Sequence, residues 1–400
     1  MTTNVTCLGC GCACDDIDIV TRDARIVEAT NACELGVRWF GDGRVPSWSS
    51  IGERRVERHE ALSAAAQLLK KASRPLVYLA PDLSCEAQRE AVGLADALRA
   101  ALDSVTSATA MPSILAAQER GRASATLGEI RHRADLVVLW NVDPSRGYPR
   151  YMSRYAPESA GRAVLRVEIA AADEVAVLTA LTAIVSGQVT RDAGQGPAWD
   201  RARVLAPQLL ACRYVAIVAD GETDGVDPKD SGRAAALIAL AQALNGPTRA
   251  ALSLLRAGGN RSGADSVMTS QTGYPAAVDF THGHPRYQPY DGTAAARLWR
   301  GDVDALLVVG AALAIPAALL TLMARVPRAI VGPKASDSGL ALASGHLSTM
   351  ERVVIDTGIA GIHDGGTAMR MDDVPLPLRP SLSGPPNCAD VVSALRQAMR

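Results

Sequence analysis

Short apolar runs separated by helical stretches form the main hydrophobic pattern of the chain from residue 60 onward. The runs lack the alternation of polar and apolar positions that marks a strand with one solvated face. They are therefore predicted to be strands buried on both faces, and each is too short to cross a membrane. They lie at residues 76–80, 136–140, 164–167, 215–219, 306–310 and 329–332.

Alanine-rich segments between these runs are predicted to be helices. Alternation of strand and helix implies right-handed crossovers and parallel sheets, whose ligands bind at the carboxyl ends of the strands. The fold class is therefore predicted as α/β, with Rossmann-like parallel sheets covered by helices on both faces. The clearest helical segments are residues 86–101, 172–186, 233–244 and 316–325.

The N-terminal region follows a different pattern and is predicted to form a small cysteine-rich lobe. Residues 15–20 and 24–29 are expected to pair as a hairpin, and residues 41–58, rich in Gly, Ser, Arg and Pro, are expected to form a surface connection. With 400 residues, two or three domains are expected. The predicted boundaries are 1–55 for the lobe, 56–170 for a first α/β domain and 171–400 for a second α/β domain with the C-terminal segment.

Four cysteines in this lobe, Cys7, Cys10, Cys14 and Cys33, have the spacing of iron–sulfur ligands. Three thiolates on one short loop and a fourth beyond a hairpin suit a [4Fe-4S] cluster. A zinc site usually contains two close cysteine pairs, and the second pair is absent. The residues before Cys7 do not resemble a signal peptide, so a reducing, cytoplasmic location is expected and disulfides are not. Reduced thiols without a metal remain the alternative, and Cys12 is an additional thiol in the loop.

Composition limits the choice of partners. Hydrophobic residues make up 48% of the chain and aromatic residues only 4%, so the core is expected to consist of aliphatic side chains. The 41 basic and 42 acidic side chains give a net charge of −1, which provides no field to hold a polyanion or a membrane surface. Nucleic acid and membrane partners are therefore not expected.

Two loops that follow apolar runs are candidates for ligand binding. Residues 141–147 contain Asp143 and Arg146, and residues 256–263 contain two glycines between Arg256 and Arg261. Glycine permits close backbone approach to a ligand and arginine binds phosphate. Neither loop matches a dinucleotide or Walker fingerprint, so ordinary strand-to-helix turns are the alternative.

Motifs spread over nearly the whole chain resemble the B subunit of formylmethanofuran dehydrogenase, a molybdopterin oxidoreductase. That resemblance implies a fold similar to formate dehydrogenase and DMSO reductase, here without the C-terminal barrel. It also implies that the cluster relays electrons to a tungsten or molybdenum pterin. The motifs are Cys7–Ile17, Asn31–Cys33, Cys85–Arg89, Thr126–Glu129, Arg133–Asp135, Pro149–Arg154, Thr272–Pro275, Val278–Phe280, Pro285–Tyr287 and Gly366–Asp372.

The chain departs from this family at the position of the metal. The family ligates the metal through a cysteine or selenocysteine followed by histidine, and here Thr109 and Ala110 stand at those positions. A hydroxyl does not replace a soft thiolate, and a methyl group transfers no proton. His282 replaces a family arginine and is expected at the same site. His282 and His284 are expected to have a surface or cavity-lining role, and joint ligation of a metal ion is the alternative.

These departures imply a retained fold without the reaction, as in the similar B subunit of the formyltransferase/hydrolase complex of methylotrophs. The resemblance then implies a non-catalytic subunit, without a molybdenum or tungsten pterin. Its partners would be the A and C hydrolase subunits and the D formyltransferase subunit. Such a complex converts formyl-tetrahydromethanopterin to formate through a methanofuran-like carrier. The alternative is an active molybdenum or tungsten formylmethanofuran dehydrogenase.

Overall fold

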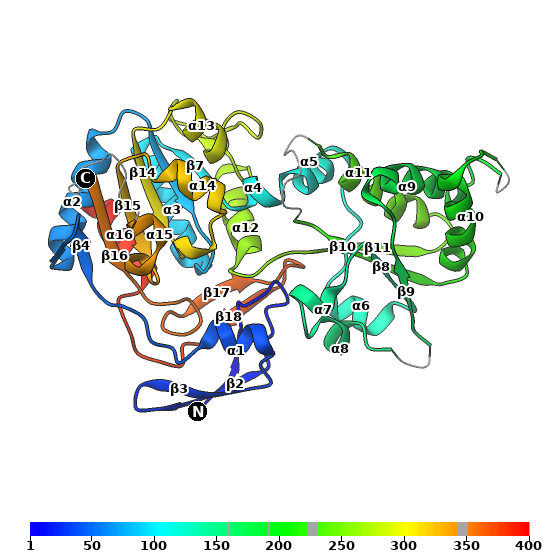
Figure 1. The fold of residues 1–400 in the computed structure, drawn as a ribbon, viewed down its shortest axis with the longest axis horizontal. Helices are drawn as coiled ribbons and strands as arrows, with labels where there is room; N and C mark the ends of the chain where they lie inside the picture. Colours follow the sequence, from blue (N-terminus) through cyan, green and yellow to red (C-terminus); the bar gives the residue numbers. More distant parts are fainter. Residues whose placement is uncertain (159–160, 191–192, 223–229, 343–350, 400) are drawn as a thin grey trace. The chain divides into compact units, whose positions relative to one another are not determined.

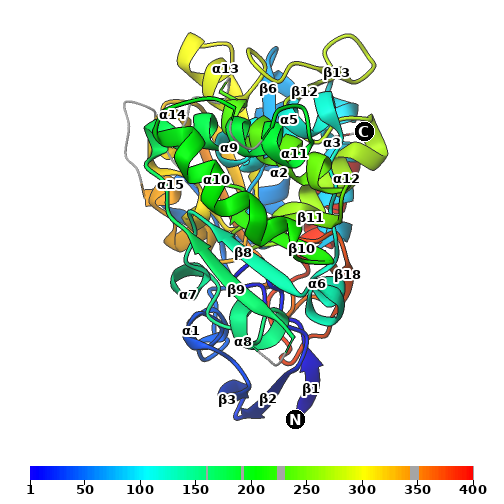
Figure 2. The same cartoon turned by 90° about the vertical axis from the view of Figure 1, so that its right-hand side faces the viewer.

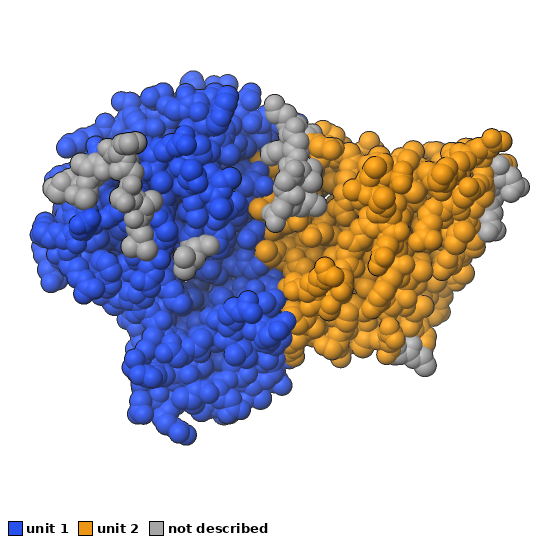
Figure 3. Space-filling model, in the orientation of Figure 1, with its two compact units in different colours: residues 1–108, 258–400 blue, residues 109–257 orange. Residues whose placement is uncertain are grey.

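The computed structural model describes residues 1–399 except 159–160, 191–192, 223–229 and 343–350. The chain forms two compact units, one of residues 1–108 with 258–400 and one of residues 109–257 (Figure 3). The first unit is thus discontinuous in sequence. These divisions differ from the boundaries predicted after residues 55 and 170, because strands from both ends of the chain pair in one sheet.

The first unit is built on a mixed sheet that has nine strands among the described residues. Its five central strands are parallel, in the order β7-β6-β14-β15-β16, and short antiparallel strands close both edges. In spatial order the strands are β13 (Arg286–Tyr287), β12 (Val278–Asp279), β7 (Ala101–Ser104), β6 (Pro75–Leu79), β14 (Ala305–Val309), β15 (Arg328–Gly332), β16 (Arg352–Asp356), β4 (Ser49–Ile51) and β5 (Arg54–Val56).

Helices cover both faces of this sheet (Figure 1). Helix α3 shows why: Ser84 caps its start by accepting the Ala87 N–H, and its small side chains at helical spacing pack on the sheet. Leu94 and Ala95 are buried, and Leu98 is partly buried. One face carries α2 (Arg58–Lys71), α3 (Cys85–Leu98), α12 (Arg261–Thr272) and α16 (Cys388–Ala398), and the other α13 (Ala294–Arg300), α14 (Ala317–Met323) and α15 (Gly339–Leu342), with 3₁₀ turns at Ala312–Ala314 and Ala335–Asp337.

Two small antiparallel sheets complete the first unit. The first contains β1 (Thr2–Val5), β2 (Ile17–Arg22) and β3 (Arg25–Thr30), and helix α1 (Glu34–Phe40) follows it. The second contains β17 (Gly366–Met369) and β18 (Pro375–Leu378). The hairpin predicted over residues 15–29 is therefore present as β2 and β3.

The second unit contains an all-parallel sheet in the order β11-β10-β8-β9 (Figure 2). Helices α9, α10 and α11 pack on one face, while α6, α7 and α8 lie across the sheet from them (Figure 1). Its elements are α5 (Met111–Arg120), α6 (Leu127–Arg133), β8 (Leu136–Trp140), α7 (Pro144–Gly147), α8 (Tyr151–Tyr155), β9 (Ala163–Val167), α9 (Ala171–Val185), α10 (Pro197–Leu210), β10 (Tyr214–Asp220), α11 (Gly232–Leu244) and β11 (Arg249–Leu255), and α4 (Thr106–Thr109) joins the two units in sequence.

The mixed α/β class with parallel sheets is confirmed, and all six apolar runs are strands. The surface connection predicted over residues 41–58 is wrong, because it contains β4 and β5 at one edge of the large sheet. Polar side chains at this edge concealed the strands. Among the described residues no helix has the length and apolar character needed to span a bilayer.

Asp103, on β7, is the buried carboxylate that joins the edge of the large sheet to its loops. It is fully buried and accepts the N–H groups of Ala277 and Ala294 and the hydroxyl of Ser107, at 3.0, 2.6 and 2.6 Å. Burial raises the pKa of this carboxyl, and the hydrogen bonds oppose that shift. One side chain thus anchors the starts of β12 and α13.

Replacement of this anchor tests its contribution to stability. Asp103→Ala leaves three buried donors without their acceptor, and we expect the free energy of unfolding to fall by about 3–5 kcal/mol. Ser107→Ala removes only one donor and should cost about 1 kcal/mol. Urea unfolding followed by circular dichroism measures both, and equal effects of the two variants would contradict the anchoring role.

Candidate metal-cluster site

The cysteine loop lies between β1 and β2. Its ends are joined by a hydrogen bond of 2.9 Å from the Cys7 N–H to the Cys14 carbonyl, and a tighter turn joins the Ala13 N–H to the Cys10 carbonyl at 3.1 Å. Cys33 lies outside the loop, at the N-cap of α1. The short loop and the helix start therefore present the four predicted cysteines.

The four thiols are neighbours in the folded chain. Gly36 shows this most directly, because a Cβ built on it would lie 3.4 Å from the Cys7 sulfur and 4.0 Å from the Cys33 sulfur. Burial raises the pKa of the Cys7 thiol, the Gly9 N–H that donates to its sulfur lowers it, and the nearby Cys10, Cys14 and Cys33 raise it further. A protonated Cys7 thiol is therefore favoured in the absence of a metal.

Cys7, Cys10, Cys14 and Cys33 are the residues of this region that could hold a cluster. In the described part of the chain, no three His, Cys, Asp or Glu side chains converge closely enough to hold a metal ion. The Gly9 N–H donates to the Cys7 sulfur at 3.4 Å. The missing side chain of Gly36 keeps the space between two of the thiols open. None of the eight cysteines, all of which are described, is in a disulfide.

The glycine loop at residues 258–259 holds the cysteine loop in place. A Cβ on Gly258 would overlap the Leu8 carbonyl oxygen and lie 2.8 Å from the Cys10 nitrogen. The Gly259 N–H donates to the Leu8 carbonyl at 3.0 Å. Two glycines predicted to approach a ligand thus approach the backbone of the cysteine loop. On another side, the Met371 N–H donates to the Gly11 carbonyl at 3.1 Å.

A cavity of about 290 Å³ adjoins this contact. Asp82, just past the carboxyl end of β6, lies in its wall with the side chains of Trp39 and Arg261. Burial raises the pKa of Asp82 to about 6, against the opposing effects of the Trp39 hydrogen bond and of the charges on Arg261 and Lys334. Asp82 was not among the site residues predicted from the sequence, although its place shortly after a buried strand is where ligand-binding residues of such sheets lie.

The other loop arginines have structural roles. Arg256 forms a largely buried ion pair with Glu222 at 3.0 Å rather than an open phosphate site. In the loop at residues 141–147, Asp143 caps α7 by accepting the Ser145 N–H, and Asn141 accepts the Ile169 N–H. Residues 141–147 therefore form an ordinary strand-to-helix turn, which was the alternative to a ligand-binding loop.

Thr109 and Ala110 lie just beyond the carboxyl end of β7. Thr109 ends the helical turn α4, which begins two residues after β7, and Ala110 is the N-cap of α5. Both are buried, with 9% and 3% of their surface exposed. The position therefore offers a hydroxyl and a methyl group in a largely desolvated setting.

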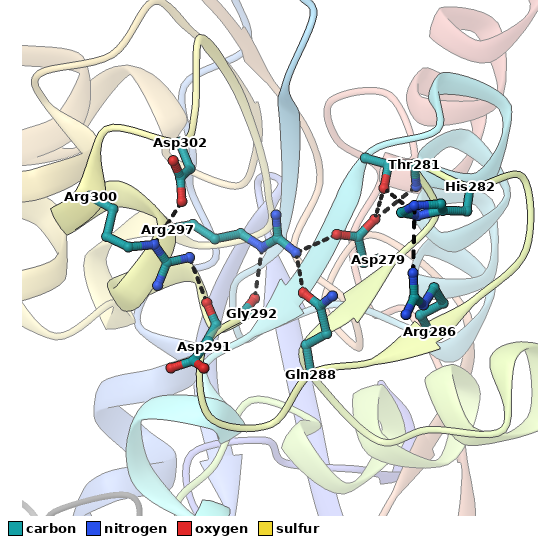
Figure 4. A network of polar contacts seen from close by, with 10 residues as sticks. All are labelled: Asp279, Thr281, His282, Arg286, Gln288, Asp291, Gly292, Arg297, Arg300 and Asp302. Carbon is teal, nitrogen blue, oxygen red and sulfur yellow. Dashed lines mark hydrogen bonds and ion pairs between the residues drawn. The ribbon is translucent and has the colours of Figure 1, made fainter.

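His282 does not belong to that position. Strand β12 runs antiparallel to β7 and pairs Asp279 with Ala101, so His282 lies past the amino end of β7. It is exposed and contacts the Thr281 hydroxyl at 3.1 Å and Arg286 at 3.5 Å (Figure 4). The expectation that His282 lies at one site with Thr109 is corrected. The antiparallel pairing places His282 beyond the amino end of β7, whereas Thr109 follows its carboxyl end.

Known proteins similar to this chain were found by sequence and by structure. No family model matches the chain. The B subunit of tungsten-containing formylmethanofuran dehydrogenase 2 from Methanocaldococcus jannaschii is 28% identical over 426 residues, covering 96% of this chain and 94% of that protein. The same subunit from Methanococcus maripaludis is 29% identical over 418 residues, with the same coverage. The chain is homologous to the B subunit of formylmethanofuran dehydrogenase.

A solved structure shares the fold of this chain. It is a chain of the formyltransferase/hydrolase complex from Methylorubrum extorquens in complex with methylofuran, with a TM-score of 0.72 and 24% identity. The match covers 88% of this chain and 98% of that chain. The resemblance stated from the motifs is thereby confirmed.

Gly258→Ala tests how the cysteine loop is held. The added methyl group meets backbone atoms that have no room to move, so the loop should shift and the buried Cys7 and Cys14 should react with iodoacetamide at least about tenfold faster in the native protein. Gly147→Ala is the matched control, because a Cβ there meets nothing within 4 Å. Unchanged alkylation in Gly258→Ala would contradict the assignment.

Asp82→Asn tests the raised carboxyl pKa. A native pKa of about 6, above the unfolded value of about 3.9, adds stability below pH 4 that is lost as the pH rises through 6. Relative to wild type, the asparagine variant should gain about 1–3 kcal/mol in free energy of unfolding between pH 4 and 7. Urea titrations at several pH values measure this difference. The wild-type curve alone is insufficient, because Asp364 also has a pKa near 6.

Proposed function

We propose that this chain is a non-catalytic, B-type subunit of a formyltransferase/hydrolase complex. In this role it supports conversion of formyl-tetrahydromethanopterin to formate through a methanofuran-like carrier, in cytoplasmic one-carbon metabolism. Its partners are then the A and C hydrolase subunits and the D formyltransferase subunit, with no nucleic acid and no membrane. The reacting groups lie on those partners.

The observation that carries the proposal is the combination of full-length homology with the residues at one position. The chain aligns with its dehydrogenase homologue over 96% of its length, yet presents Thr109 and Ala110 after β7. A hydroxyl and a methyl group supply neither a soft metal ligand nor a proton carrier. The shared fold with a chain of a complex that binds methylofuran supports the same conclusion.

The finer fold assignment belongs to the same proposal. We place the chain with formate dehydrogenase and DMSO reductase in architecture, without their C-terminal barrel, and treat residues 1–55, which contain the cysteine loop, as the cluster lobe. In that setting Cys7, Cys10, Cys14 and Cys33 are the residues that would hold a [4Fe-4S] cluster, which would supply a rigid link or electron transfer. The alternative state is four reduced thiols in the same loop.

The second candidate function is an active molybdenum or tungsten dehydrogenase, favoured by the name of the relatives. Metal and pterin analysis of anaerobically purified protein separates the two functions, because stoichiometric tungsten or molybdenum with pterin would refute the non-catalytic role. Iron and sulfide counts, with visible absorbance, decide the separate matter of the cluster. Protein without iron should yield Cys7, Cys10 and Cys14 as reduced thiols after denaturation.

Thr109→Ala tests whether chemistry passes through this subunit. Formyl transfer and hydrolysis by the assembled complex should stay within about twofold of wild type, since no reacting group is removed. Thr109→Cys should not create dehydrogenase activity, because Ala110 still provides no proton-transfer group. A hundredfold loss of turnover for Thr109→Ala in an intact complex, about 2.7 kcal/mol of transition-state stabilisation, would make this subunit catalytic.

A further inference from the structure

Aromatic side chains concentrate in one short stretch of this aromatic-poor chain. The whole sequence has 5 Trp, 8 Tyr and 2 Phe, and five of these residues fall between Tyr274 and Trp299. Trp299 is 79% exposed and Tyr290 is 46% exposed. Scattered exposed leucines or valines need no explanation, but a tryptophan this open beside a second exposed aromatic marks a contact surface.

The backbone that carries these two side chains is held rigidly. Arg297 lies at the centre: its guanidinium pairs with the Asp279 carboxylate and donates to the Gln288 side chain at 2.7 Å and the Gly292 carbonyl at 3.0 Å (Figure 4). Arg300 donates to the Asp291 carbonyl at 2.7 Å, which ties the residue after Tyr290 to the residue after Trp299. Exposed aromatics on a fixed backbone lose little entropy on binding.

The turn before β13 adds two histidines to the same network, and Arg286 at the start of β13 adds one positive charge. His282, His284 and Arg286 are all exposed there, and Arg286 forms no ion pair among the described residues. The nearby Asp279 carboxylate already accepts a hydrogen bond from the Thr281 hydroxyl and forms an ion pair with Arg297. Beside the turn, Tyr287 stacks on Tyr274 with ring centroids 5.0 Å apart and planes at 5°.

This surface also forms one end of the large sheet. Strand β13 is the terminal strand, so its outer backbone groups face away from the sheet. Proteins normally protect such edges, and a pairing chain is one means of protection. Arginine and aromatic side chains around an open edge are the composition of interface centres.

We propose that this aromatic edge, formed by His282, His284, Arg286, Tyr287, Tyr290 and Trp299, docks another subunit through a segment that presents carboxylates beside an apolar anchor. The inference rests on the proposed function in that the partner belongs to the same complex. Trp299 and Tyr290 provide the apolar contact. Arg286 meets the carboxylates, because its charge lacks a carboxylate partner in the described part of this chain.

The test uses the assembly as the cell makes it, isolated through an affinity tag on this chain and analysed by native mass spectrometry. Tyr290→Ala combined with Trp299→Ala should lower the occupancy of one subunit at least about tenfold, without loss of the others. Arg286→Glu should weaken retention of the same subunit and remove its sensitivity to salt. Val204→Ala, at a valine that is 56% exposed in α10, is the control and should leave the composition unchanged.

Protection of Trp299 provides a second measurement that does not depend on assembly yield. Hydroxyl-radical oxidation of Trp299 should be several-fold slower in the wild-type assembly than in the Arg286→Glu assembly. Equal oxidation together with unchanged subunit composition would overturn the proposal. Conversion of a self-associated chain to a monomer, or release of nucleic acid by the variants, would also overturn it, because the occupant would then be different.

The outcomes separate this proposal from the proposed function. If the subunit lost is neither a hydrolase nor a formyltransferase subunit, the docking surface stands and the proposed complex is wrong. If the expected subunits are present and all variants retain them, the complex stands and the docking surface is wrong. Circular dichroism of each variant assembly shows whether the chain remains folded.

Discussion

The backbone contact between Gly258 and the cysteine loop is the constraint on which the candidate site depends. It brings together residues about 250 positions apart in sequence, and it excludes even a methyl group. Because the loop is pressed against residues 258–259, its thiols meet the start of α1, and Asp82 meets Trp39 beside a small cavity. A loop held by backbone atoms fixes the positions of the cysteines that it carries.

That contact requires the discontinuous organisation of the first unit. The chain leaves the large sheet after β7 and returns at residue 258, after the second unit is complete. The next strand of that sheet along the chain is β12, which pairs antiparallel with β7, so two neighbouring strands are joined by a connection the size of a domain. Thr109 stands at the point of departure, where the second unit begins.

Buried polar contacts stabilise the fold of the first unit. The carboxylate of Asp103 satisfies backbone donors on two other segments, and Arg297 satisfies three acceptors between β12 and α13. Loss of either would leave buried polar groups without partners, at a cost independent of catalysis. Under the proposed function, such contacts preserve the fold of a subunit whose partners carry the chemistry.

The sequence by itself determined six buried strands, the main helices, the α/β class, the cysteine spacing and the resemblance to the dehydrogenase B subunit, because burial on both faces and ligand spacing are local properties. Only the tertiary structure decided which strands are neighbours. Pairing of β6 with β14 and of β16 with β4 depends on burial and register between distant segments. The boundaries predicted at residues 55 and 170 therefore differ from the division of the chain into its two units. The antiparallel turn that separates His282 from Thr109, and the role of Gly258 against the cysteine loop, were decided by the same long-range pairing.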